Sequence, residues 1–192
     1  MIPAKDLHEE ARAFHRCLPQ RLWDYRNARG IPDAVIHRHL LGWNGLRITI
    51  PITNREGQAV AFKLAKDPAD ASDSPKMIAA LGSRAELYGW EHIAAKPEQI
   101  IICEGEFDRL VLESQGFVAV TSTCTAGTFR PEWGAYFEPI PSIYVCFDND
   151  VADREGAKRV AQVIPLARVV HLPGEVGEGG DVTDFFVRLT RP

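Results

Sequence analysis

The sequence predicts an α/β protein, in which a parallel sheet flanked by helices follows a small α+β subdomain. From residue 99 onward, short and almost wholly apolar segments alternate with helix-like segments, a pattern typical of a parallel sheet covered on both faces. Before that point, residues 1–41 have the apolar spacing of helices, and residues 46–66 have the alternation of a β-hairpin. We therefore expect two parts, an N-terminal subdomain over residues 1–96 and an α/β domain over residues 97–192.

The N-terminal helices are predicted by apolar residues at helical spacing. Leu7, Ala11 and Phe14 belong to one such run, and Gly30-Ile31-Pro32 ends the helical stretch that follows it. A further short helix is expected over residues 33–41.

A β-hairpin is expected after these helices. Leu46, Ile48 and Ile50 alternate with polar residues, as in a strand with one apolar face. The turn Asn54-Arg55-Glu56-Gly57 then leads to a second strand over residues 58–66.

Four strands of the α/β domain are short and rich in β-branched residues, and helix-like stretches separate them. The strands are expected at residues 99–103, 117–121, 142–147 and 167–172. Helices are expected at residues 85–93, 106–115, 130–137, 152–164 and 182–188. Ligands bind at the carboxyl ends of the strands in such a sheet, so the residues that follow each strand are the candidates for function.

Composition excludes several classes of protein. The 192 residues are 45% hydrophobic and 25% charged, which is typical of a soluble globular protein, and no apolar run reaches the roughly 18 residues of a membrane span. The N-terminus is charged too early for a signal peptide, so we expect a cytoplasmic protein without membrane contact. The four cysteines form no CxxC pair, which argues against a structural zinc site and against disulfides.

A net charge of −4 argues at first against a nucleic-acid partner, because phosphate binding needs a basic face. The charge is unevenly distributed, however. Residues 1–100 hold 14 Lys and Arg against 12 Asp and Glu, whereas residues 101–192 hold 8 against 14. The excess of acidic residues therefore lies in the α/β domain, where bound divalent cations would offset part of it.

Acidic residues follow three of the expected strands. Glu104 comes directly after the first strand, Asp148 and Asp150 follow the third, and Asp181 and Asp184 follow the fourth beyond a Gly-rich loop. Crowding these anions at one edge of the sheet is unfavourable without a cation. Carboxylate oxygens without Cys or His are the protein ligands that magnesium prefers. The sequence therefore predicts a magnesium site at this edge.

Each acidic group taken alone has a structural alternative. Glu104 and Asp108 would favour a helix N-terminus through the helix dipole, and Asp148-Asn149-Asp150 would suit a turn. Either Asp181 or Asp184 would serve as a helix N-cap. The metal site is favoured because three acidic clusters occur at three strand ends of one repeating architecture.

The order of these motifs resembles the Toprim domain, which DnaG-type primases, topoisomerases and certain nucleases share. Glu104-Gly105-x-x-Asp108 follows the first strand, Gly127-Thr128 the second and Asp148-Asn149-Asp150 the third. This resemblance covers about residues 98–192. The complete set in this order is specific, whereas the first motif alone is weak.

The resemblance to bacterial and phage-type primases extends further towards the N-terminus. Arg29-Gly30-Ile31, the hairpin beginning at Arg47, Phe62-Lys63 and Pro75-Lys76 occur in the order expected of the N-terminal half of a primase RNA-polymerase core. With that half included, the resemblance spans roughly residues 26–190. Topoisomerases and small Toprim nucleases are not expected to share this half.

The resemblance implies a metal site with a defined set of ligands. Glu104, Asp148 and Asp150 would be the catalytic metal ligands, and Asp181 and Asp184 resemble the last acidic motif and would add further ligands. The implied cation is Mg²⁺ or Mn²⁺, with no zinc. Phage-like relatives often carry a lysine directly before this last motif, and glycine stands in its place at position 180, which puts one phosphate contact in doubt.

The resemblance also implies residues that contact nucleic acid or nucleotide. Lys63 and Lys76 match positions of the family's basic surface, and Arg47, Arg84 and Asp108 are further candidates. The alternative for each lysine is a solvated side chain on a hairpin or a loop. The implied partners are a single-stranded DNA template and ribonucleoside triphosphates.

The activity implied by the resemblance is the synthesis of short RNA primers in DNA replication, by metal-dependent phosphoryl transfer. Two alternatives stay open: a Toprim nuclease, in which Glu104 acts as general base, and a non-catalytic nucleic-acid-binding module. The zinc-binding domain and the helicase part that usually accompany a primase core are not recognised in the sequence. We therefore expect a core from a phage or mobile element, or one part of a larger system, with a replicative helicase or a separate zinc-domain protein as partner.

Overall fold

The computed structural model describes residues 6–123 and 129–189, apart from the side chains of residues 152 and 153. Its contacts divide the chain into two compact units. The first unit consists of Met1–Asn27 and Pro32–Arg84, and the second consists of Ala28–Ile31 and Ala85–Pro192. The division falls earlier than the 96/97 boundary expected from the sequence, because the short strand β5 (Leu87–Tyr88) pairs inside the second unit.

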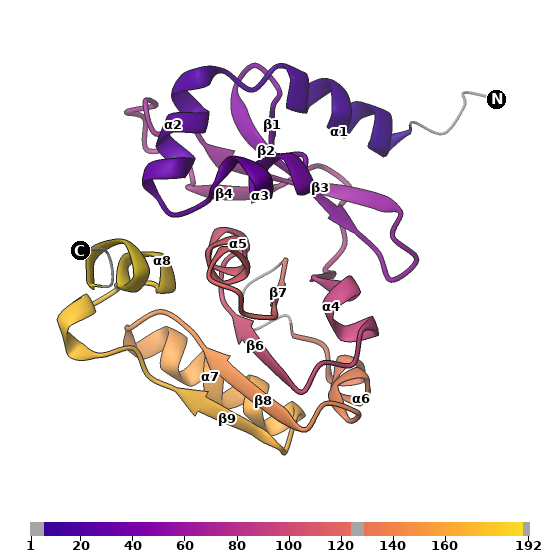
Figure 1. Ribbon diagram of the computed structural model, residues 1–192, viewed down its shortest axis with the longest axis vertical. Helices are drawn as coiled ribbons and strands as arrows, with labels where there is room; N and C mark the ends of the chain where they lie inside the picture. The colour runs from indigo at the N-terminus through magenta and orange to yellow at the C-terminus, as the bar shows by residue number, and fades with distance from the viewer. Residues whose placement is uncertain (1–5, 124–128, 190–192) are drawn as a thin grey trace. The chain divides into compact units, whose positions relative to one another are not determined.

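The described part of the first unit combines three helices with a four-stranded antiparallel sheet (Figure 1). The helices are α1 (Leu7–Arg16), α2 (Gln20–Ala28) and α3 (Asp33–Arg38). The strands, which lie in chain order, are β1 (Gly42–Trp43), β2 (Arg47–Thr53), β3 (Ala59–Lys66) and β4 (Met77–Ala79). The predicted hairpin is confirmed as the antiparallel pair β2 and β3, whereas β1 and β4 lie in stretches for which the sequence predicted no strand.

Local sequence explains where these elements begin and turn. The Asp6 side chain accepts hydrogen bonds from two main-chain amides and so caps α1. In the turn between β2 and β3, the Asn54 side chain accepts hydrogen bonds from the amides of Glu56 and Gln58. Gly57 completes this turn with a φ of 76°, a conformation that glycine adopts without steric cost.

Burial along β2 differs from the one-sided pattern that the sequence suggested. Ile48 and Ile50 are fully buried, but so is Thr49 between them, and Arg47 is only 8% exposed. Leu46, which the alternation assigned to the apolar face, lies just before the strand and is 72% exposed. The alternation of apolar and polar residues thus predicted the strand correctly, but it did not predict that both faces of the strand are buried.

The second unit is a mainly parallel five-stranded sheet with helices packed around it (Figure 1). Its strands, in spatial order, are β5, β7 (Ala119–Ser122), β6 (Gln99–Cys103), β8 (Ser142–Cys146) and β9 (Ala167–Val170). β5 is antiparallel to β7, and the other neighbouring strands are parallel. The helices are α4 (Trp90–Ala94), α5 (Glu106–Ser114), α6 (Gly134–Phe137), α7 (Val151–Val163) and α8 (Val182–Asp184), which continues as a π-helical turn over Phe185–Leu189. The predicted α/β fold is confirmed.

The core of the second unit is built on the neighbouring strands β6 and β8. Ile100, Ile102, Ile143 and Val145 are at most 1% exposed and pack in one cluster with Phe137. Burying each such side chain contributes about 1.5–3 kcal/mol, so the two strands whose ends carry acidic residues are held firmly. None of the helices formed by the described residues has the length and apolar character of a membrane span.

Candidate active site

The register of β6 and β8 brings the first and third acidic motifs together. Cys103 and Cys146 lie opposite each other at the ends of these parallel strands, so the residues that follow them leave the sheet at the same edge. The amide of Asp148 donates a hydrogen bond of 3.4 Å to Oε2 of Glu104. The Glu104 carboxylate and the main chain of the acidic loop after β8 are therefore direct neighbours.

The neighbouring strand β7 supports Glu104 from the other side. The hydroxyl of Thr121, a fully buried residue of β7, donates a hydrogen bond of 2.7 Å to the main-chain carbonyl of Glu104. Thr121 therefore fixes the backbone from which the carboxylate projects. The motif Gly127-Thr128 expected after this strand lies outside the described residues and stays a sequence expectation.

Gly105 and Asp108 explain the spacing of the first motif. A Cβ atom on Gly105 would lie 2.6 Å from Oδ2 of Asp108, so a larger residue would displace this carboxylate. Oδ1 of Asp108 accepts hydrogen bonds of 2.7 Å from the hydroxyl of Thr183 and 3.3 Å from its amide. These bonds join α5 to α8. Because Asp108 is only 7% exposed, its side chain is not presented to a nucleic acid or nucleotide.

The environment of Asp108 is poorly solvated and acidic. Burial, and next the negative charge of Asp181, raise the pKa of Asp108 to about 7, although hydrogen bonds from Thr183 act in the opposite direction. Burial also raises the pKa of Asp181. A cation near these carboxyls is therefore favourable, because it offsets the cost of keeping them ionised.

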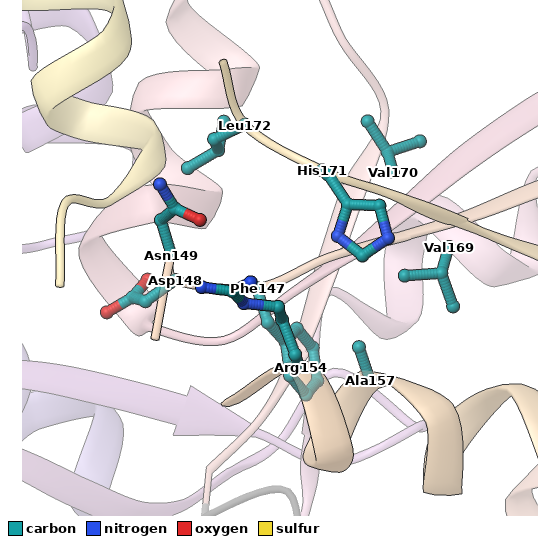
Figure 2. Close-up of a pocket in the computed structure, with 9 residues that line it drawn as sticks. All are labelled: Phe147, Asp148, Asn149, Arg154, Ala157, Val169, Val170, His171 and Leu172. Atoms are coloured by element: carbon teal, nitrogen blue, oxygen red, sulfur yellow. The ribbon is translucent and has the colours of Figure 1, made fainter. Parts of the chain in front are cut away.

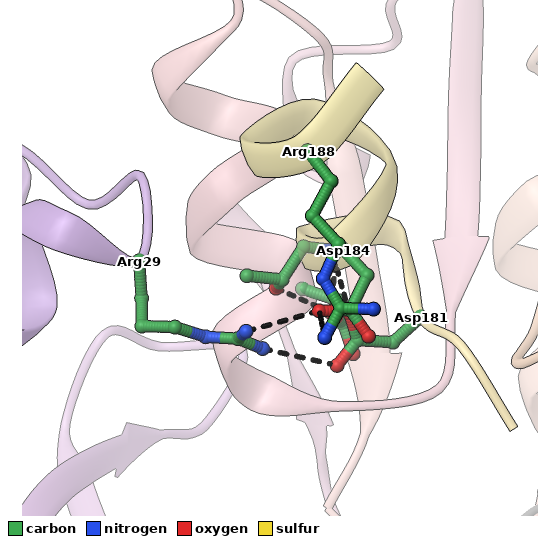
Figure 3. A network of polar contacts seen from close by, with 6 residues as sticks. Arg29, Asp181, Asp184 and Arg188 are labelled. Carbon is green, nitrogen blue, oxygen red and sulfur yellow. Dashed lines mark hydrogen bonds and ion pairs between the residues drawn. The ribbon is translucent and has the colours of Figure 1, made fainter. Parts of the chain in front are cut away.

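Arg29 supplies such a cation to the last acidic motif (Figure 3). Its Nη1 donates a hydrogen bond of 3.0 Å to Oδ1 of Asp184, and its Nη2 lies 3.4 Å from Oδ2 of Asp181. Arg188 approaches Asp184 at 3.5 Å with a side chain that is 65% exposed. The sequence brought Arg29 forward only as part of a resemblance, because no local spacing can relate residues that are 152 and 155 positions apart.

Asp181 also acts as the N-cap of α8. Its Oδ1 accepts a hydrogen bond of 2.6 Å from the amide of Asp184, which is the structural role that the sequence offered as an alternative to metal binding. Both carboxylates of the last motif thus already have polar partners inside the second unit.

Main-chain hydrogen bonds join the last motif to the loop Asp148-Asn149-Asp150. The amide of Asn149 donates to the carbonyl of Gly180 at 2.9 Å, and the amide of Gly179 donates to the carbonyl of Asn149 at 3.2 Å. The side-chain amide of Asn149 adds a hydrogen bond of 3.1 Å to the carbonyl of Gly177. The Gly-rich segment before Asp181 therefore lies against the acidic loop after β8.

The structure gives a steric reason for glycine at position 180. A Cβ atom there would lie 2.5 Å from Cγ1 of Val176 and 2.6 Å from its main-chain oxygen. A lysine, which phage-like primases often carry at the corresponding place, does not fit this loop. The phosphate contact that such a lysine would make is therefore absent from position 180.

A small pocket opens beside the acidic loop, between the ends of β8 and β9 and the start of α7 (Figure 2). Arg154 and His171 line it together with Asp148 and Asn149. Nε of Arg154 donates a hydrogen bond of 3.1 Å to the carbonyl of Asp150 and so fixes the backbone of a candidate ligand. No sequence pattern singles out Arg154, because an arginine in a polar helix usually faces solvent.

The two cysteines at this edge of the sheet are not available as thiolate ligands. Burial raises the pKa of Cys103 well above its usual value and that of Cys146 to about 11, so both thiols stay protonated near neutral pH. Within residues 6–123 and 129–189, no three His, Cys, Asp or Glu side chains are gathered closely enough to hold a metal ion. The candidate ligands Glu104, Asp148 and Asp150 thus lie along one edge without forming a finished metal cluster.

The basic candidates belong to the first unit and differ in exposure. Lys76 and Arg84 are exposed, and Lys63 in β3 is half-buried. Nη1 of Arg47 donates a hydrogen bond of 2.9 Å to the carbonyl of Pro75, and Arg47 is only 8% exposed. Arg47 therefore supports the main chain next to Lys76 and is not placed to meet a phosphate directly.

Comparison with known proteins shows what the second unit is similar to. Residues 101–186 match the model of the Toprim-like family. A DNA primase of Pseudomonas aeruginosa is 29% identical over 124 residues, which are 62% of this chain and 18% of the relative. The chain spans about a fifth of the length of the curated primases that it matches.

Solved structures share the fold over most of the chain. The primase of Aquifex aeolicus, with its zinc-binding and RNA polymerase domains, aligns with a TM-score of 0.80 and 22% identity, covering 96% of this chain and 57% of that chain. The RNA polymerase domain of Mycobacterium tuberculosis primase DnaG aligns with a TM-score of 0.76 and 16% identity, covering 95% and 77%. At these identities, the similarity shows a common fold.

Proposed function

Residues 101–186 form a Toprim-like domain in a chain with the fold of DnaG-type primase cores, and on this premise we propose that the chain synthesises short RNA primers on single-stranded DNA. The observation that carries the proposal is the meeting of Glu104 with Asp148 at the carboxyl edge of the parallel sheet. Several of the curated relatives are named DNA primase, which supports the same activity.

Glu104, Asp148 and Asp150 are the residues that would hold Mg²⁺ or Mn²⁺, because a set of carboxylate oxygens suits a hard cation. When bound, such a cation neutralises charge on the transferring phosphoryl group and activates the attacking hydroxyl. The chain's own contribution is to hold the ligands in place. Thr121 fixes the carbonyl of Glu104, and Arg154 fixes that of Asp150. Fixed charges matter because positioning and electrostatic stabilisation carry most of a phosphoryl transfer.

Lys63, Lys76 and Arg84 are the proposed contacts for the phosphates of template and nucleotide. Two of them are exposed and the third is half-buried, and a basic surface of this kind holds single-stranded nucleic acid mainly through its backbone. Arg47 and Asp108 are assigned supporting roles, because each is buried and bonded to other parts of the protein.

The remaining proposals concern the larger system in which the chain works. We place the catalytic domain at residues 97–192, a range that contains the family match, with the primase-core-like subdomain before it. We also propose that it works in the cytoplasm, with a replicative helicase or a separate zinc-domain protein as partner. This chain matches only 18% of the length of a related primase. The rest of such a primase holds other parts, and we propose that separate proteins supply their functions here.

The test is to incubate the protein with single-stranded DNA, ribonucleoside triphosphates and Mg²⁺ or Mn²⁺. Short RNA products that depend on template and metal are expected. Degradation of the template without products would instead indicate a Toprim nuclease, and binding without turnover would indicate a non-catalytic module. Omission of the metal and omission of the template are the controls.

A further inference from the structure

The last acidic motif concentrates negative charge, which Arg29 offsets at both aspartates and Arg188 offsets at Asp184. Asp181 and Asp184 are joined by a hydrogen bond of 2.6 Å from the Asp184 amide to the Asp181 side chain, and the buried carboxyl of Asp108 lies behind Thr183. Arg29 contacts both aspartates through separate nitrogen atoms (Figure 3). Its side chain is 31% exposed, against 65% for Arg188, so solvent screens the Arg29 ion pairs less.

The segment next to this ion-pair cluster is bonded to the acidic loop after β8. Gly180, which directly precedes Asp181, accepts the hydrogen bond from the amide of Asn149, and Gly179 donates to the carbonyl of Asn149. Gly180 and Asp181 are covalently adjacent, so the Arg29 ion pairs and the hydrogen bonds of Asn149 hold the same short segment of main chain. Asn149 lies between Asp148 and Asp150 in the chain, so its main-chain position helps to set the Cα positions from which these two carboxylates project.

We propose that Arg29 is a positioning residue for the Asp148-Asn149-Asp150 loop, and that Asp181 and Asp184 serve as its counter-ions instead of metal ligands. The inference rests on the proposed function only in taking Asp148 and Asp150 as metal ligands. Arg29 acts through its ion pairs with Asp181 and Asp184 and through the main chain of Gly180.

The competing assignment, in which Asp181 and Asp184 bind the metal, predicts the opposite sign for one measurement. If these aspartates were ligands, Arg29 would compete with the cation, and its removal would tighten metal binding. If Arg29 positions the loop, its removal weakens metal binding, although a positive charge has been taken from an acidic region. The direction of the change therefore separates positioning from simple charge repulsion.

The first experiment measures amide hydrogen exchange by NMR in the full chain and compares Arg29→Gln with Arg188→Gln. Arg188 is the matched control, because it also approaches Asp184 but is far more exposed. We expect Arg29→Gln to speed exchange at the amides of Asn149 and Gly179 about tenfold, since it removes charged hydrogen bonds that hold this segment. Arg188→Gln should leave both amides unchanged. Equal exchange in wild type and a folded Arg29→Gln overturns the proposal.

The second experiment titrates Mn²⁺ by electron paramagnetic resonance. Loss of a residue that orients metal ligands typically weakens affinity by about tenfold or more, and we expect this for Arg29→Gln, with Arg29→Lys intermediate and Arg188→Gln unchanged. In an Asp184→Asn background, Arg29→Gln should have a smaller effect, because one partner is already lost. Tighter Mn²⁺ binding by Arg29→Gln overturns the proposal in favour of Asp181 and Asp184 as ligands.

Two features keep the test decisive. Should Arg29→Gln fail to fold, Arg29→Lys and Asp184→Asn carry the same exchange measurement, and unchanged exchange at Asn149 in both overturns the proposal. Should the wild type bind no Mn²⁺ and make no primers, the proposed function fails, while faster exchange at Asn149 would still support the positioning role of Arg29. The two failures are therefore distinguishable.

Discussion

The main-chain amide of Asp148 donates to Oε2 of Glu104 over 3.4 Å, although the two residues are 44 positions apart in the chain. They meet because β6 and β8 are parallel neighbours that end at the paired residues Cys103 and Cys146. A carboxylate at the end of one strand therefore reaches the acidic loop of the next strand. The proposed metal site needs this arrangement.

Replacing Glu104 by glutamine is expected to lower primer synthesis about 100-fold, because it removes one charged oxygen ligand from the proposed site. The glutamine side-chain oxygen can still accept the hydrogen bond from Asp148, so the loop should keep its place. The measurement is the initial rate of template-dependent RNA synthesis at saturating Mg²⁺. Glu155→Gln is the control, since Glu155 lies on the exposed side of α7 and pairs with Lys158. A Glu104→Gln protein as fast as the wild type would remove Glu104 from the site.

Gly180→Ala is expected to lower the free energy of unfolding by about 1–3 kcal/mol, the usual cost of forcing extra atoms into a packed place. The added Cβ would meet the main-chain oxygen of Val176 at 2.6 Å, and a backbone atom cannot move aside as easily as a side-chain end. Urea unfolding measures the change. Gly174→Ala is the matched control in the same segment, because a Cβ there meets nothing within 4 Å, and an equal loss in both variants would contradict the steric argument.

Arg109→Met is expected to destabilise the second unit by about 3 kcal/mol, because it leaves the carboxylate of Glu113, whose side chain is 9% exposed, without its buried partner. Arg109 is fully buried and pairs with Glu91 and Glu113. Its Cζ atom lies 4.2 Å from the ring centroid of Tyr88. Glu91→Gln should cost less, since the Glu91 side chain is 53% exposed. Chemical denaturation of the three proteins checks the order, and an Arg109→Met protein as stable as the wild type would contradict it.

Asp67 is expected to make the first unit sensitive to acid. The hydrogen bonds from Arg21 are the main cause that lowers the pKa of Asp67 below its ordinary value of 3.8. As the pH falls, Asp67 of the unfolded chain therefore takes up a proton at a higher pH than Asp67 of the folded chain. The stabilisation is fully present above the pKa of the unfolded chain and is lost as the pH falls through the lowered pKa of the folded chain. Thermal unfolding of the wild type and Asp67→Asn between neutral pH and strong acid should show the difference between them shrinking with acidity. A constant difference at all pH values would contradict this role.

Local patterns in the sequence were enough to predict much of the fold. Apolar strands alternating with helices predicted the parallel sheet, and Asn54 and Gly57 predicted the hairpin turn, because hydrophobic periodicity and turn chemistry act between residues close in the chain. The short strands β1 and β4 were missed, since segments of two or three residues carry no periodic signal. Their pairing partners, and not their own residues, make them strands. The helix expected over residues 85–93 was wrong in its first part, where β5 forms, and α4 begins only at Trp90.

The candidate site divides in the same way. The sequence alone determined which carboxylates follow the strands, and therefore that Glu104, Asp148 and Asp150 leave the sheet at one edge. Only the tertiary structure decided that Arg29 pairs with Asp181 and Asp184, and that Asp108 is buried against Thr183. The physical reason is that strand ends are set by local backbone preferences, whereas ion pairs and burial depend on segments that folding brings together from distant parts of the chain.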